Sequence, residues 1–180
     1  MKVKDITLIA LFTALISVCA QITIPIQPVP ITGAIVGIFI TGAVLEKKQG
    51  FIVGIIYILL GTVGIPMFTG FGAGVSSIIG PTGGYLIVYP IMIYLIAWCI
   101  EKFKKENVLF LTIYMIISLI PCYLIGTIWL AISCKLGIYQ AILSGVAPFV
   151  VFDIMKGVVA AFISVAINKA LVKGHLYERN

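Results

Sequence analysis

The stretch VLFLTIYMIISLIPCYLIGTIWLA, which spans residues 108–131, contains no charged side chain. A helix needs about 20 consecutive apolar residues to cross the hydrocarbon core of a bilayer, and this stretch is longer than that. Lipid tolerates only helices or closed barrels, and no alternation of polar and apolar residues indicates a barrel. The stretch therefore predicts a transmembrane helix and decides the fold class.

The composition extends this prediction to the whole chain. Of the 180 residues, 62% are apolar and 10% are charged, whereas about 25% are charged in an ordinary soluble domain. A soluble chain of this length could not enclose so much apolar surface in one core. We therefore predict one integral membrane domain over residues 1–180, with the lipid bilayer as its main surroundings.

Six apolar segments divide the chain, and together they predict an all-α bundle of six transmembrane helices. They run over residues 6–24, 31–45, 50–64, 83–100, 108–131 and 146–171. The first is longer than the apolar core of a signal peptide, which has about 7–15 residues, so we interpret it as a retained helix.

Positive charges indicate the orientation of these helices. Ten of them fall at the N-terminus, after the second and fourth segments, and in the C-terminal tail: Lys2, Lys4, Lys47, Lys48, Lys102, Lys104, Lys105, Lys169, Lys173 and Arg179. The other three connections together contain one, Lys135. The positive-inside rule then predicts that both termini are cytoplasmic. The net charge of +6 is thus a topology signal, and no basic, aromatic face indicates nucleic acid.

Two of the predicted outer connections have an unusual composition. The first, PIQPVPIT at residues 25–32, is rich in proline, and the second, residues 64–84, has seven glycines and no charge. A loop of about 20 residues is uncommon unless it is functional or disordered. Because this loop is too apolar for a disordered tether, we expect it to cap the outer end of the bundle between the third and fourth helices.

Asp153 and Lys156 are the two charges in the predicted membrane interior. Their spacing places them on one helix face, about 10 and 15 Å below the outer end of a helix that begins at Val146. Each charge costs about 2.5–3.5 kcal/mol at mid-membrane, so such residues are usually functional. A structural salt bridge and a proton path are the alternatives, but no further ionisable residue extends a relay.

The pair therefore predicts the floor of a polar ligand pocket below the two outer loops. Polar contributions to the pocket are expected from Gln27, Thr32, Ser76, Ser77, Thr82, Tyr85 and Tyr89. A stand-alone channel or a membrane enzyme is a further alternative, and the lack of a readable nucleophile beside the pair disfavours the enzyme. The four cysteines are scattered and the single histidine is near the C-terminus, so no metal site or cofactor is expected. The glycines of residues 70–74 lack the flanking residues of a nucleotide-binding loop.

Small residues four apart recur in the first three segments, as Ala10 and Ala14, Gly33 and Gly37, and Gly50 and Gly54. Such pairs let membrane helices approach one another closely. Packing within the bundle is the simplest interpretation, and the alternative for Ala10 and Ala14 is contact with another membrane protein.

Four motifs resemble the BioY family, the biotin-binding membrane subunits of energy-coupling-factor transporters. They are PVPIT at 28–32, GIPMFTGFGAG at 64–74, GPTGGYL at 80–86, and Asp-x-x-Lys at 153–156. The resemblance implies that Phe68, Gly72 and Gly83 from the covering loops join the ligand site. With biotin as the ligand, we expect its ureido group to meet Asp153 and Lys156, and the alternative for Lys156 is the carboxylate of biotin. A different vitamin, such as thiamin, riboflavin or lipoate, is the alternative, because Thr32-Gly33-Ala34 stands where the family often has Thr-Leu-Gln.

The resemblance also implies partners and a location. Ala10 and Ala14 are similar to the small-residue motif by which such subunits dock on a transmembrane coupling protein. That protein would work with two cytoplasmic ATPase subunits, which would use the ATP while this chain captures biotin outside. The expected location is the bacterial plasma membrane.

Overall fold

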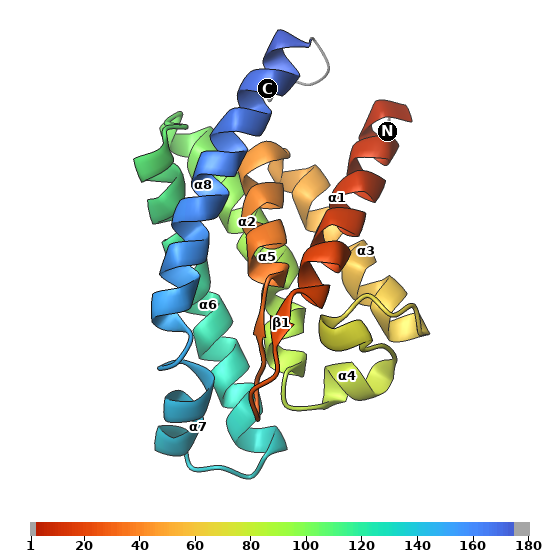
Figure 1. Ribbon diagram of the computed structural model, residues 1–180, viewed down its shortest axis with the longest axis vertical. Helices are drawn as coiled ribbons and strands as arrows, with labels where there is room; N and C mark the ends of the chain where they lie inside the picture. Colours follow the sequence, from red (N-terminus) through yellow and green to blue (C-terminus); the bar gives the residue numbers. More distant parts are fainter. Residues whose placement is uncertain (1–2, 175–180) are drawn as a thin grey trace.

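The computed structural model describes residues 3–174, which form a bundle of helices (Figure 1). Eight α-helices, one short 3-10 helix and two short strands lie in this part of the chain. Four of the helices are long and apolar enough to cross a membrane: α1 (Val3–Gln21), α5 (Gly83–Phe103), α6 (Val108–Ser133) and α8 (Val150–Lys173). The predicted class of helical membrane protein is therefore confirmed.

Two shorter helices fill the centre and one side of the bundle. They are α2 (Ala34–Val44) and α3 (Lys47–Val63). All residues of α2 except Val36 are buried, which suits a helix that is apolar on every side and packs against α1, α5 and α8. These two helices and the four long ones correspond to the six predicted segments, with each end shifted by at most four residues.

The packing of α2 and α3 depends on close approach at glycine. A side chain at Gly37 would lie 2.9 Å from the Cα atom of Ile16 in α1, and one at Gly54 would lie 2.7 Å from the Cα atom of Pro90 in α5. Because no larger residue fits between these backbones, both glycines are packing positions within the bundle. Ala10 and Ala14 differ from them, since both lie on the exposed face of α1.

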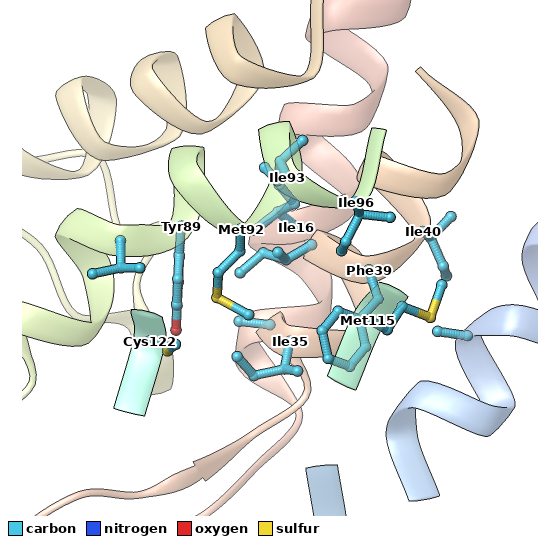
Figure 2. Close-up of a cluster of buried hydrophobic side chains, with 14 of the residues drawn as sticks. Ile16, Ile35, Phe39, Ile40, Tyr89, Met92, Ile93, Ile96, Met115 and Cys122 are labelled. Carbon is cyan, nitrogen blue, oxygen red and sulfur yellow. The ribbon is translucent and has the colours of Figure 1, made fainter. Parts of the chain in front are cut away.

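The apolar core lies where α1, α2, α5 and α6 meet (Figure 2). Ile16, Phe39, Met92 and Met115 each come from a different one of these helices and are fully buried. Tyr89 lies at one edge of the cluster in Figure 2. The core therefore extends from the middle of the bundle toward the end that holds the connections described next.

The connections after α1 and α3 contain structure that was not predicted in detail. Strands β1 (Thr23–Ile24) and β2 (Ile31–Thr32) form an antiparallel hairpin, with Thr23 opposite Thr32. The 64–84 loop contains a 3-10 turn at Thr69–Phe71 and α4 (Val75–Ile79). Figure 1 places the hairpin and α4 at one end of the bundle, called the loop end below, and both termini at the other. Strands this short have no periodicity by which a sequence could reveal them.

The start of the last helix differs from the prediction. A further helix, α7 (Ile138–Gly145), lies at the loop end, and α8 begins at Val150 instead of Val146. Pro148 separates the two helices because proline disfavours helical backbone in the residue before it. Asp153 therefore lies in the first turn of α8, nearer to the helix end than the expected depth of about 10 Å.

Candidate ligand-binding site

An ion pair joins two residues near the start of α8, at the loop end. The Nζ atom of Lys156 donates a hydrogen bond to Oδ1 of Asp153 at 2.8 Å, within one turn of α8. Asp153 is 4% exposed, and the first turn of a helix stabilises its negative charge through the free N–H groups and the helix dipole. The lysine ammonium carries three protons, so it keeps donors for a ligand.

The second carboxylate oxygen is bound by a residue that sequence reasoning missed. The hydroxyl of Tyr123 in α6 donates to Oδ2 of Asp153 at 2.7 Å. A tyrosine in an apolar helix needs a polar partner, which was the available signal. That signal did not distinguish Tyr123 from Tyr114 in the same helix. Which side of α6 contacts α8 is decided by the packing of the bundle.

Two adjoining cavities lie beside this cluster. The larger, of about 120 Å³, lies under the hairpin connection and the 64–84 loop, and the smaller, of about 40 Å³, reaches Asp153 and Lys156. Both are lined by Val29, Pro30, Thr32, Tyr85 and Tyr89. A ligand that occupies both cavities would therefore face charged side chains of the protein at one end and mostly apolar side chains along its length.

Eight predicted site residues are brought together around these cavities. Asp153 and Lys156 line the smaller one, Phe68, Ser77 and Thr82 line the larger one, and Thr32, Tyr85 and Tyr89 line both. These residues come from the hairpin, the 64–84 loop, α5 and α8. Their contacts with a ligand remain predictions.

Four predicted residues do not line either cavity. Gln27 lines a separate, shallow depression together with Gln140 and Ser144 near α7. Gly83 packs against the carbonyl group of Ile78 and against Trp129, and this contact leaves no room for a side chain. Gly72 accepts a backbone hydrogen bond from Phe68, and Ser76 accepts one from Gly80. Gly83, Gly72 and Ser76 therefore contribute to the packing of the loop.

Further lining residues were also missed. They are apolar or uncharged and come from every wall of the site: Val29, Pro30, Ile35, Thr69, Leu86, Cys122, Gly145 and Phe149. Such residues are indistinguishable in sequence from lipid-facing or core residues. The carbonyl oxygen of Gly145 accepts a hydrogen bond of 3.0 Å from the hydroxyl of Tyr85, which joins the end of α7 to α5.

The site can bind a ligand that is apolar over most of its length and has hydrogen-bond donors and acceptors at one end. Those donors and acceptors would face Asp153 and Lys156. Within residues 3–174 there is no group of three or more His, Cys, Asp or Glu side chains that could hold a metal ion.

Comparison with known proteins shows the family to which the chain belongs. The model of the BioY family matches residues 1–173. The chain belongs to the BioY family. It is 43% identical to the "Probable biotin transporter BioY" of Pyrococcus horikoshii, over 91% of this chain and 96% of that protein. It is 38% identical to the biotin transporter BioY of Thermotoga maritima, over 91% of this chain and 95% of the relative.

A solved structure of a biotin-binding subunit has the same fold as this chain. The crystal structure of the S-component for biotin from an ECF-type ABC transporter superposes with a TM-score of 0.86 at 29% identity. The match covers 93% of this chain and 92% of the other. This BioY-family chain is therefore a membrane-embedded transporter component and not an enzyme.

Proposed function

We propose that the chain is the subunit that recognises biotin for uptake across the membrane. The observation that carries the proposal is the Asp153–Lys156–Tyr123 cluster, which lies at the polar end of an otherwise apolar cavity. The names of the relatives identify the ligand class, because the family members compared above are called biotin transporters.

The chemistry of biotin fits the two ends of this cavity. Its ureido group has two N–H donors and one carbonyl acceptor. Each carboxylate oxygen of Asp153 has a lone pair beyond the one that already accepts a hydrogen bond, and Lys156 retains donors. The bicycle and the aliphatic tail are apolar, and Phe68, Tyr85 and Tyr89 offer aromatic walls to them.

For the topology, we infer six membrane crossings with both termini cytoplasmic and the loop end outside. The lysine distribution supports this orientation, and the position of both termini at one end agrees with it (Figure 1). The 11 residues of α2 span about 16 Å at 1.5 Å per residue, which is less than a bilayer core of about 30 Å. Because α2 is enclosed by other helices, a short crossing at this place is compatible with the membrane.

For the partners, we infer a transmembrane coupling protein and two cytoplasmic ATPase subunits in the bacterial plasma membrane. Seven residues of α1 lie on one exposed stripe: Val3, Ile6, Thr7, Ala10, Leu11, Ala14 and Val18. The small residues at its centre allow a partner helix to approach closely. ATP would be used by the ATPase subunits, and biotin would be the substrate of the assembled transporter.

Titration calorimetry on the purified protein in lipid nanodiscs tests the ligand assignment. Saturable biotin binding below micromolar concentration is expected, without competition from thiamin, riboflavin or lipoate. Biotin methyl ester should bind like biotin, and iminobiotin, which lacks the ureido oxygen, should bind more weakly. Tighter binding of one of the other vitamins would contradict the proposal.

Tyr123→Phe is expected to weaken biotin binding about 5- to 10-fold, because the variant loses one hydrogen bond to a charged group. The ring, and therefore the packing of α6 against α8, is retained. Calorimetry checks this, with Tyr114→Phe as the matched control, since the hydroxyl of Tyr114 is buried in the same helix without a hydrogen-bond partner among the described residues. Equal affinity of the two variants would exclude a role for Tyr123 in the site.

A further inference from the structure

One wall of the larger cavity is made by a short part of the 64–84 loop. This part, residues 67–72, is called the lid segment below. Phe68 and Thr69 from this segment line the cavity. Phe68 is 2% exposed, and its ring packs edge-on against Tyr57 of α3 with 5.5 Å between ring centroids. The position of the lid segment therefore sets the shape of the cavity.

The backbone of the lid segment is strained at one residue. Gly70 and Phe71 both have left-handed backbone, with φ of 64° and 60°. Glycine tolerates this conformation, but a residue with a Cβ atom adopts it only at a cost in free energy. The side chain of Phe71 is 70% exposed, so burial of its ring does not compensate for that cost. The backbone of Phe71 must be held by another contact.

Gln21, the last residue of α1, makes that contact. The N–H group of Phe71 donates to Oε1 of Gln21 at 2.7 Å. The Nε2 atom of Gln21 lies 2.9 Å from the carbonyl oxygen of Ser17, 3.3 Å from that of Phe68 and 3.5 Å from that of Met67. Since a peptide N–H only donates and carbonyl oxygens only accept, the surroundings determine the orientation of this amide.

A second hydrogen bond fixes the beginning of the lid segment. The hydroxyl of Tyr57 donates to the carbonyl oxygen of Met67 at 3.0 Å. Tyr57 thus holds the segment from α3, and Gln21 holds it from α1. Of the two, Gln21 alone binds Phe71, the residue with strained backbone.

We propose that Gln21 is a positioning residue for ligand binding, whose side-chain amide holds the lid segment in the conformation that places Phe68 and Thr69 in the cavity wall. This inference rests on the function proposed above. Without the amide, Phe71 relaxes to ordinary backbone and the lid segment moves off the cavity. A bound ligand then escapes faster, whereas its entry is not slowed.

The variant Gln21→Leu tests this, because leucine has a similar volume and neither donor nor acceptor. We expect biotin to dissociate about tenfold faster in stopped-flow measurements, with an unchanged or faster association rate. Hydrogen exchange in the ligand-free protein should increase in peptides that cover residues 64–74 and stay unchanged in α1 and α2. Gln21→Glu keeps the acceptor for Phe71 and should restore part of the protection.

Gln140→Leu is the matched control, because Gln140 is an exposed glutamine at the same end of the bundle that lines the separate depression. It should change neither the dissociation rate nor the exchange of the lid segment. Unchanged dissociation and exchange in Gln21→Leu would overturn the proposal. Faster exchange throughout α1 and α2 would also overturn it, because it would indicate a general packing role. If the wild-type protein does not bind biotin, the proposed function fails, whereas the exchange measurement still decides the role of Gln21.

Discussion

Asp153→Asn is expected to weaken biotin binding about 100-fold, because the variant loses the charged acceptor for two ureido N–H groups. The asparagine keeps the shape of the side chain, so the cavity stays the same size. Lys156→Met should also weaken binding, since it removes the donors that would face the ureido oxygen in the proposed site. Calorimetry with biotin measures both effects.

Thermal unfolding of the same variants distinguishes a binding site from a structural salt bridge. Breaking a buried ion pair by removing one partner costs about 3–5 kcal/mol, whereas replacing both partners together is often nearly neutral. The double variant Asp153→Asn/Lys156→Met should therefore regain most of the stability that Asp153→Asn loses. It should not regain biotin binding. A double variant that binds biotin normally would show that the pair serves stability alone.

Ala10→Trp combined with Ala14→Trp is expected to abolish co-purification with the transmembrane coupling protein and biotin uptake by cells. Both alanines lie on the exposed stripe of α1, and two indole rings there would prevent the close helix approach that small residues permit. Biotin binding by the isolated subunit should remain within about twofold of wild type, because the stripe is on the opposite face of α1 from the core.

Leu124→Trp is the control for this experiment. Leu124 is 60% exposed on α6, so the substitution adds an indole to a different outward face of the bundle. It should leave both co-purification and uptake unchanged. If the double tryptophan variant of α1 still co-purified with the coupling protein, the docking surface would have to lie elsewhere. If it lost biotin binding too, the substitution would have disturbed the fold.

The Asp153–Lys156 pair could be found in the sequence because lipid makes charges rare and costly. Tyr123 is uncharged and was missed, because its need for a polar partner is shared with Tyr114 until the facing helix is known. Gln27 was expected in the site because it lies in the proline-rich connection. The hairpin instead directs it to a separate depression, and strand pairing of this kind depends on contacts that the local sequence does not encode.

The sequence by itself determined the helical membrane class, the six apolar segments and the buried charges, because each follows from the cost of exposing polar groups to lipid. The tertiary structure decided which helix faces meet. It placed the hydroxyl of Tyr123 against Asp153, brought Gln21 to the strained backbone of Phe71, and left Ala10 exposed while burying Gly37. In a bundle that is apolar on nearly every surface, hydrophobicity does not distinguish inside from outside, so close packing and a few hydrogen bonds settle these positions.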